Sequence, residues 1–249
     1  MTLRTRFVLV ETSHAGNVGA VARAMKVMGF DDLVLVRPRW PDVLQHQEAQ
    51  DRASGANDVL AKARVVAHLH EALDGMTHVC ATAMTPRDFG PPTRTPREHL
   101  PTVAGAGQQG VAFVFGSERY GMRNEDVYRC HVCLRIPTVG EYGSLNIAAA
   151  LQLVAYEWRL ALDAVAQGSV SPVFTPEAAV QADATAVAGM LQHWEQALIQ
   201  VGYLDPAAPK KLMPRLQQLF NRAQVSTEEI HILRGVAKAM LDTAAQAKR

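Results

Sequence analysis

Three short groups of polar residues, far apart in the chain, have the types and spacing of a ligand-binding site. They are Asn17-x-Gly19-x-x-x-Arg23, Gly116-x-Glu118-x-x-Gly121 and Gly143-Ser144-Leu145-Asn146. Each group lies where an apolar run gives way to a loop or a helix, and loops at the carboxyl edge of a parallel sheet commonly bind ligands. Glycines in such loops let the backbone approach a ligand closely. The sequence therefore predicts one polar crevice formed by three distant segments.

Each group also has a purely structural explanation when it is taken alone. Asn17 is a common type of helix cap, and Arg23 would then be a surface cation in an ordinary ion pair. The second group would be a plain glycine turn, and Ser144 would cap the helix that follows it. These alternatives stay open on the residues alone.

Apolar runs predict the elements that must position the three groups. Strands are expected at residues 7–10, 33–36, 77–82, 111–115 and 132–136, and helices at 18–28 and 145–166. Strands that alternate with helices indicate an α/β fold whose parallel sheet is covered on both faces.

A small all-α domain is expected after this α/β domain. Residues 167–176 contain Gly, Ser and Pro and are predicted to link a first domain at 1–166 to a helical domain at 177–249. Thr175 and Pro176 are typical of a helix start, and Ser226 with Glu229 forms a capping box. Three amphipathic helices bury little apolar surface, so they are expected to pack against the first domain or a second subunit.

Composition restricts the function classes. The 249 residues carry a formal net charge of +1, so any nucleic acid would have to be bound by local basic patches. The apolar run at 7–10 is too short for a signal peptide or a membrane span, and three cysteines fit a reducing compartment. A cytoplasmic protein without membrane contact is expected. No GxGxxG follows a strand, which argues against a dinucleotide-binding enzyme.

Cys130 and Cys133 have CxxC spacing, the pattern of half a zinc site. No second ligand pair accompanies them, and they lie at the entrance of a predicted strand. We therefore expect them in the core and expect no metal. His14, beside Asn17, is equally explained as a ligand contact or as a solvated loop residue.

The three polar groups resemble, in order and spacing, the three motifs of the SpoU branch of the SPOUT methyltransferases. The segments 8–14, 23–29 and 230–235 are similar to the tRNA (cytidine/uridine-2′-O)-methyltransferases of that branch, so the resemblance covers both domains. It implies a SPOUT-type parallel sheet whose C-terminal part forms a trefoil knot, followed by the small all-α domain. It also implies a homodimer with the site near the subunit interface.

The resemblance implies S-adenosyl-L-methionine as cofactor and methylation of the ribose 2′-oxygen at nucleotide 32 of the tRNA anticodon loop. Carried over by position, the cofactor-binding residues are Thr82, Ala83, Met84, Gly116, Ile136, Gly143, Ser144 and Leu145. The motifs are shared across the branch, so methylation of another RNA such as rRNA is an alternative. A non-catalytic RNA-binding relative is a second alternative.

The catalytic residues implied by the resemblance are Arg23, Asn17, Glu118, Ser144 and Asn146. A guanidinium stays protonated and has no acceptor, so we expect Arg23 to stabilise developing negative charge and the others to position the reacting groups. Glu118 or a water molecule would receive the hydroxyl proton, and no metal is required.

Basic residues are the candidates for contact with tRNA phosphates. They are Arg119, Lys210, Lys211, Arg215 and Arg222, of which the last four lie in or beside one predicted C-terminal helix. A solvated helix face is the alternative explanation of these charges.

Overall fold

The computed structural model describes residues 3–83, 85–88, 90–139, 143–168 and 180–247. Its strands are β1 (Arg4–Val10), β2 (Asp32–Val36), β3 (Arg64–Val66), β4 (His78–Thr82), β5 (Thr93–Arg94), β6 (Gly110–Phe115) and β7 (Val132–Leu134). The helices around the sheet are α1 (Ala15–Val27), η1 (Val43–Gln45), α2 (Gln47–Ala53), α3 (Asn57–Lys62), α4 (Leu69–Ala72), α5 (Pro96–Gly105), α6 (Asn124–Tyr128) and α7 (Ile147–Ala166). The C-terminal helices are α8 (Ala184–Gln200), α9 (Leu212–Ala223) and α10 (Thr227–Ala247).

All seven strands form one sheet in the order β3-β2-β1-β6-β4-β7-β5, and every neighbouring pair is parallel. This confirms the predicted parallel α/β fold. The sequence did not predict β3 and β5, because these strands have only three and two residues, too few to show an alternating pattern. Since parallel strands end at the same edge, the loops after β1, β4, β6 and β7 meet there.

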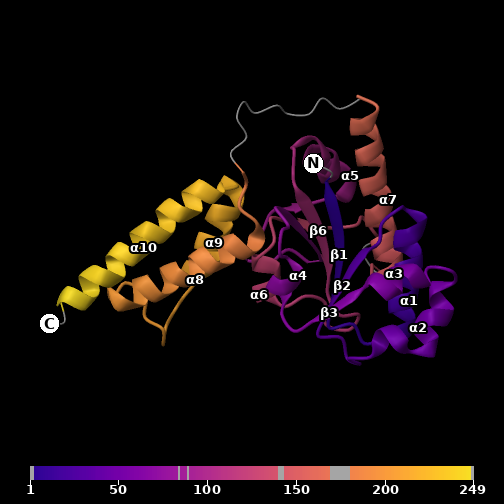
Figure 1. The fold of residues 1–249 in the computed structure, drawn as a ribbon, viewed down its shortest axis with the longest axis horizontal. Helices are drawn as coiled ribbons and strands as arrows, with labels where there is room; N and C mark the ends of the chain where they lie inside the picture. The colour runs from indigo at the N-terminus through magenta and orange to yellow at the C-terminus, as the bar shows by residue number, and fades with distance from the viewer. Residues whose placement is uncertain (1–2, 84, 89, 140–142, 169–179, 248–249) are drawn as a thin grey trace.

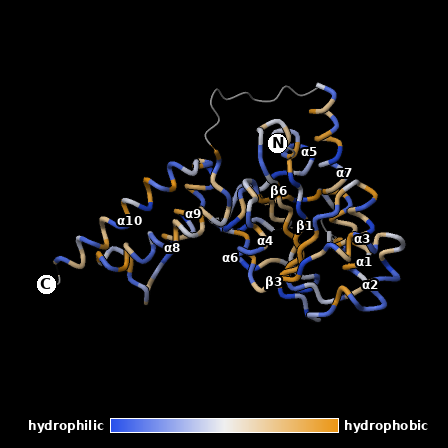
Figure 2. Tube along the Cα trace, viewed as in Figure 1, coloured by the Kyte–Doolittle hydropathy of each residue, from blue (hydrophilic) through white to orange (hydrophobic). Residues whose placement is uncertain are grey.

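Helices cover both faces of the sheet (Figure 1). On one face, Phe7, Phe113 and Trp158 form an aromatic cluster beneath α1, α5 and α7. On the other face, α4 and α6 cover a smaller apolar cluster that includes Val8 and Val114. Figure 2 shows the strands as the hydrophobic centre of this part of the molecule. The alternating side chains of β1 and β6 thus serve two cores, which fixes the register of the central strands.

The three C-terminal helices pack around a separate apolar cluster and lie to one side of the sheet (Figure 1). Asn221 of α9 donates to the carbonyl of Cys130 at 3.0 Å, and Gln218 donates to the carbonyl of Tyr128 at 3.1 Å. The Asp183 carboxylate accepts from the backbone N–H of Gly75 at 3.0 Å. The helices are therefore hydrogen-bonded to the sheet domain on the α6 side.

Local signals for the C-terminal helices have mixed outcomes. The Ser226–Glu229 capping box is present, with both reciprocal hydrogen bonds. Helix α8 begins at Ala184 with Asp183 as its cap, whereas Thr175–Pro176 and most of the predicted linker lie outside the described residues. Leu219 of α9 is 46% exposed, although it is an apolar residue of an amphipathic helix. No helix in the described ranges has both the length and the apolar character needed to cross a bilayer.

Three histidines lie together in the core, and their protonation sets a pH limit on stability. Burial, with a smaller contribution from nearby His99, lowers the pKa of His131 to about 4. Burial followed by the charges of His131 and His99 lowers the pKa of His78 well below its usual range. In the neutral state His131 accepts from the backbone N–H of Val79 at 3.1 Å through Nδ1, a bond that a proton on Nδ1 would remove.

We predict that the free energy of unfolding falls by roughly 3 kcal/mol from the His131 shift alone as the pH drops from about 6.5 to about 4. The sign follows because the unfolded chain binds a proton near pH 6.5, whereas the folded chain does not bind it until about pH 4. Urea unfolding across this range measures the effect. His131→Asn keeps an acceptor for Val79 and should lose less stability on acidification; equal losses in the two proteins would contradict the prediction.

Candidate functional site

The Glu118 carboxylate joins two of the three sequence groups at the carboxyl edge of the sheet. Its Oε1 accepts from Thr12 Oγ1 at 2.9 Å and from Asn17 Nδ2 at 2.8 Å. Its Oε2 accepts from the backbone N–H and the hydroxyl of Ser13, each at 2.9 Å. The loop after β6 is thereby fixed to the loop after β1 and to the first turn of α1.

Asn146 connects the third group to the same site. Its Nδ2 donates to Asn17 Oδ1 at 3.0 Å, while its own Oδ1 accepts from the backbone N–H of Ala148 at 2.9 Å. We call Glu118, Thr12, Ser13, Asn17 and Asn146 the Glu118 network. It holds together segments that are more than 100 residues apart in the chain.

The network decides between the structural explanations left open by the sequence. Helix α1 begins at Ala15 with His14 at its cap position, so Asn17 lies inside the first turn and is not the cap. Helix α7 is capped by Asn146 and not by Ser144. Asn17 therefore joins separate segments through its amide, and Asn146 does so in addition to capping α7.

Glu118 is held as an anion. Burial by itself would raise the pKa of Glu118, but the hydrogen bonds from Asn17, Ser13 and Thr12 outweigh it and lower the pKa below its usual value. Two donors occupy each carboxylate oxygen, which uses the acceptor capacity of the group. A carboxylate in this state is a weak base, so a positioning role for Glu118 is favoured over proton transfer.

A cavity of about 310 Å³, which we call the loop cavity, lies beside the network. All the expected cofactor-binding residues that the structure describes line it: Thr82, Ala83, Gly116, Ile136, Gly143, Ser144 and Leu145. Met84, the remaining one, lies outside the described residues. Phe115, Leu134 and Ile147 add apolar surface to the lining. A mainly apolar cavity with a few polar groups suits a small organic ligand.

Gly116 is required by the close approach of two backbone segments. A Cβ atom at this position would collide with the backbone of Gly121 and Met122. Ser117 and Gly121 exchange backbone hydrogen bonds of 3.1 and 2.9 Å, which closes the loop, and Gly121 has a φ of +66°. The loop therefore needs both glycines for its own geometry, in addition to any ligand contact.

Arg23 does not join the Glu118 network within one chain. Because α1 begins at Ala15, Arg23 lies in the third turn of the helix. It lies about 9 Å further along the helix axis than Asn17 at 1.5 Å per residue. Its side chain is exposed and makes no hydrogen bond or ion pair with a residue that the structure describes.

The other expected basic residues are distributed over two places. Arg119 lines the loop cavity, at the carboxyl edge of the sheet. Lys210, Lys211 and Arg215 line a separate cleft of about 470 Å³ in the C-terminal helices. Arg222 is exposed on α9 but does not line that cleft.

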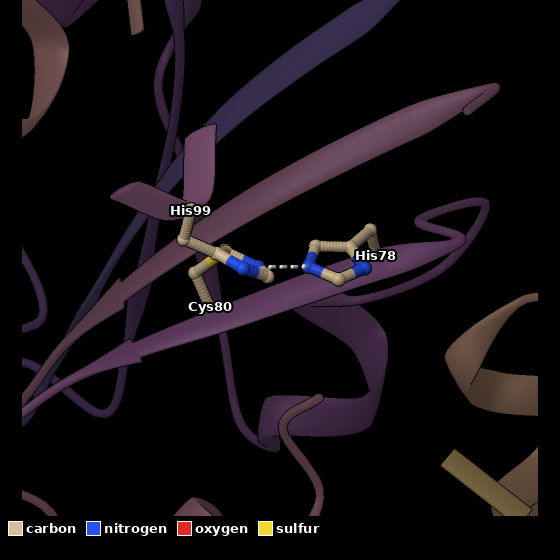
Figure 3. Close-up of side chains that lie close together, drawn as sticks. All are labelled: His78, Cys80 and His99. Carbon is tan, nitrogen blue, oxygen red and sulfur yellow. Dashed lines mark hydrogen bonds between the residues drawn. The ribbon is translucent and has the colours of Figure 1, made fainter. Parts of the chain in front are cut away.

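One group of side chains could hold a metal ion, namely His78, Cys80 and His99 (Figure 3). Their ligand atoms lie within 4.8 Å of one another, and the Nε2 atoms of His78 and His99 are hydrogen-bonded at 3.1 Å. Burial raises the pKa of the Cys80 thiol, so the group is two neutral rings and a thiol in this state. Cys130 and Cys133 are buried free thiols, at core positions as expected.

Thr12 and Ser13 belong to the site but were not expected from the sequence. They follow β1 directly, at the same edge of the sheet as the other groups. The signal in the sequence is a pair of hydroxyl residues shortly after a predicted strand, at the edge of the sheet where ligands bind.

Comparison with known families gives two matches that together span most of the chain. Residues 4–156 match the SpoU rRNA Methylase family. Residues 185–249 match the family described as tRNA methyltransferase TrmJ, C-terminal domain.

Individual proteins are similar over nearly the whole length. The tRNA (cytidine/uridine/adenosine-2′-O-)-methyltransferase TrmJ of Pseudomonas aeruginosa (strain UCBPP-PA14) is 43% identical over 242 residues, which cover 94% of this chain and 92% of that protein. The crystal structure of TrmJ from Z. mobilis ZM4 has a TM-score of 0.80 at 32% identity and covers 95% of this chain and 98% of that chain. An AdoMet-bound rRNA methyltransferase from Sinorhizobium meliloti shares the fold, with a TM-score of 0.52 at 22% identity over 64% of this chain and 57% of that chain.

We predict that Glu118→Gln lowers the free energy of unfolding by about 1–3 kcal/mol. The amide NH₂ of glutamine is a donor, and it would replace a carboxylate oxygen that accepts two hydrogen bonds, so donor would face donor. Glu125→Gln is the matched control, since Glu125 is exposed and, among the described residues, forms one long ion pair of 3.8 Å, with Arg123. Denaturant unfolding at neutral pH compares the two variants. An equal, small effect of both substitutions would contradict the assigned network.

The same pair of variants tests the charge of Glu118. The pKa of the Glu118 carboxyl is lower in the folded chain than in the unfolded chain, where it is about 4.5. The ionised carboxylate therefore stabilises the fold at pH values above about 4.5, and this contribution is lost as the pH falls through the folded pKa. The Glu118→Gln protein lacks this contribution, so its stability deficit relative to wild type should shrink as the pH falls below about 4.5.

Proposed function

This chain belongs to the SpoU rRNA Methylase family, and we propose that it is a tRNA methyltransferase that transfers a methyl group from S-adenosylmethionine to the 2′-oxygen of cytidine or uridine 32 in the anticodon loop. The observation that carries the proposal is the pair of family matches, one for each part of the chain. The relative from Pseudomonas aeruginosa, named as a tRNA 2′-O-methyltransferase, spans both parts at 43% identity.

The C-terminal match separates this proposal from its alternatives. The SpoU part alone is compatible with an rRNA substrate, whereas residues 185–249 match a domain named for a tRNA methyltransferase. A non-catalytic relative is disfavoured because the polar residues Asn17, Glu118 and Asn146 are intact and hydrogen-bonded together. The described domains therefore support tRNA as substrate and methyl transfer as reaction.

The loop cavity is the proposed cofactor site. Its lining of apolar side chains, glycine backbone and the Thr82 and Ser144 hydroxyls fits an adenosyl group with a charged amino-acid tail. S-adenosylmethionine supplies an electrophilic methyl group when it is bound. The residues of the chain need to hold and orient the ligand, exclude water and align the ribose hydroxyl. We also propose the trefoil knot of this family, in keeping with the position of β7 between β4 and β5.

The division of catalytic roles follows from the Glu118 network. Glu118, saturated with donors, fixes the loops after β1 and β6, while Asn17 and Asn146 set the position of the segment that enters α7. Ser144 lines the cavity and has no role as a helix cap, which leaves its hydroxyl available to the ligand. Arg23 stabilises negative charge on the ribose oxygen, and a water molecule accepts the proton.

A homodimer would bring Arg23 to a site that it does not reach in its own chain. Leu153, Tyr156 and Leu160 form an apolar stripe on α7 and are 43%, 45% and 44% exposed. Their spacing of three and four residues places them on one helix face, a surface suited to a second subunit. We propose that two chains pair through this stripe and that Arg23 of each completes the site of the other.

The tRNA body is bound by the C-terminal helices in this proposal. Lys210, Lys211 and Arg215 share one cleft beside exposed Tyr203, an arrangement that suits phosphate contact without sequence reading. We assign residues 1–166 to methyl transfer and 177–249 to tRNA capture. The three cysteines are free thiols, which fits a cytoplasmic enzyme.

We predict that tRNA with 2′-deoxyribose at nucleotide 32 accepts no methyl group, because the nucleophilic hydroxyl is missing. The control is the same tRNA with 2′-deoxyribose at nucleotide 33, which should be methylated at a rate within a few fold of unmodified tRNA. Transfer of radiolabelled methyl groups and nuclease mapping measure both. Methylation at nucleotide 32 of the first substrate would mean that the base is modified and not the ribose. Loss of methylation only with the second substrate would identify nucleotide 33 as the target.

We predict that Arg23→Ala and Asn146→Ala each lower turnover by roughly a hundredfold as homodimers. A purified heterodimer of the two variants contains one site with both substitutions and one intact site, provided that Arg23 acts across the interface. It should therefore recover about half of the wild-type rate. Recovery of no activity in a heterodimer that still binds cofactor would place Arg23 in the site of its own chain.

A further inference from the structure

A second cleft lies at the carboxyl edge of the sheet, next to the proposed cofactor site. It has a volume of about 590 Å³, and we call it the arginine cleft. Its lining residues are Glu11, Ser13, His14, Arg37, Arg39, Ser117, Glu118, Arg119 and Tyr120. Ser117, Glu118 and Arg119 line the loop cavity as well, so the two spaces share one wall.

The arginine cleft is lined by three arginines and two carboxylates. Glu11 is paired with Arg37 at 3.3 Å and with Arg123 at 2.8 Å, and the Glu118 carboxylate is occupied by neutral donors. Arg39 and Arg119 make no ion pair with a carboxylate of the described chain. Two guanidinium groups in the cleft are therefore available to an anion.

Both of these arginines lie over aromatic rings. The guanidinium carbon of Arg39 is 5.0 Å from the centre of the Trp40 ring, and that of Arg119 is 5.3 Å from the centre of the Tyr120 ring. Stacking uses the face of a guanidinium and leaves its N–H edge free to bind phosphate oxygens. Tyr120 is 78% exposed, so the rest of its ring is open to a second planar group.

The arginine cleft is held in place by the Glu118 network. The backbone N–H of Arg39 donates to the carbonyl of Thr12 at 2.9 Å, and Thr12 donates its hydroxyl to Glu118. Arg37 has a φ of +47°. Its backbone N–H donates to the carbonyl of Val66, and its guanidinium donates to the carbonyl of Ala67. The loop after β2 thus presents Arg39 at a set distance from the shared wall.

We propose that the arginine cleft binds the single-stranded RNA next to the target nucleotide. Arg39 and Arg119 contact successive phosphates, and an unpaired base stacks on Tyr120. Alternating cations and aromatic rings match the alternating phosphates and bases of a single strand, which is the usual chemistry of single-strand recognition. This inference rests on the proposed RNA methyltransferase function and names a surface for its substrate.

The position of the cleft explains how a buried cofactor site could receive a ribose from a large RNA. The strand would lie along the shared wall of Ser117, Glu118 and Arg119, with the target ribose over the loop cavity. Phosphate contacts fix the register of a strand without reading its bases. The arginine cleft would then align the strand locally, while the C-terminal helices bind the tRNA body.

The test uses the full-length protein and a fluorescent anticodon stem-loop RNA. Arg39→Gln removes an exposed charge at the carboxyl ends of the strands. Arg64→Gln is the matched control, because Arg64 is also exposed but lies at the start of β3, where the amino ends of the strands meet. We expect Arg39→Gln to weaken RNA binding about tenfold and to reduce the salt dependence of log Kd by about one. Tyr120→Ala should weaken RNA binding about tenfold without changing its salt dependence, because a stacking ring and not a charge is removed. Tyr120→Phe keeps the ring and should keep the wild-type affinity for RNA.

Methylation kinetics provide the second measurement. For Arg39→Gln we expect KM for tRNA to rise about tenfold, with kcat and S-adenosylmethionine affinity within a few fold of wild type. Arg39→Lys should recover part of the lost affinity, which a merely structural role of Arg39 would not predict. A short single-stranded RNA should compete with the stem-loop for wild type better than a duplex of the same length does.

Failure of the proposal can be distinguished from failure of the proposed function. If wild-type protein does not methylate tRNA, the function itself is wrong. If wild type is active but Arg39→Gln and Arg64→Gln bind RNA with the same affinity and salt dependence, the arginine cleft does not bind the strand. Equal competition by duplex and single-stranded RNA, or by a polyanionic peptide, would likewise overturn the proposal.

Discussion

The carboxylate of Glu118 is the interaction on which the site depends. This side chain accepts four hydrogen bonds from Thr12, Ser13 and Asn17. Asn17 in turn accepts a hydrogen bond from the amide of Asn146. These hydrogen bonds join the loops after β1 and β6 to the segment that enters α7. Charge-assisted hydrogen bonds to a half-buried carboxylate are strong enough for this purpose, and a neutral amide could not satisfy all four donors.

This constraint links the two spaces that flank the loop after β6. The loop cavity and the arginine cleft share Ser117, Glu118 and Arg119, so the network that shapes one also shapes the other. Thr12 shows the coupling most directly, because its hydroxyl binds Glu118 and its carbonyl holds the backbone of Arg39. The proposed cofactor site and the proposed RNA-binding cleft therefore share one wall, whose position the Glu118 network sets.

Arg23 lies apart from the Glu118 network within one chain. Arg23 lies on the third turn of α1, exposed and without a described partner, while the apolar stripe of α7 is uncovered. Both features are explained if a second copy covers the stripe and supplies the arginine. The C-terminal helices, fixed to the sheet domain through Asn221 and Asp183, would then extend the surface offered to a large substrate.

The sequence alone determined the elements with strong local signals. The apolar runs of β1, β2 and β6, the long helix α7 and the capping box of Ser226 could be read because periodicity and capping are local. The strands β3 and β5 were missed, since two or three residues carry no period and are held by their neighbours. The sequence also placed Asn17, Glu118 and Asn146 in one group, and the structure joins them by hydrogen bonds, but the sequence did not predict that Thr12 and Ser13 take part or that Arg23 does not. Only the fold could show that Asn17 binds Glu118, that Arg23 lies outside the Glu118 network, and that Arg39 lines the same cleft as Glu118. Each depends on where a helix begins or on contacts between residues far apart in the chain, which local patterns do not carry.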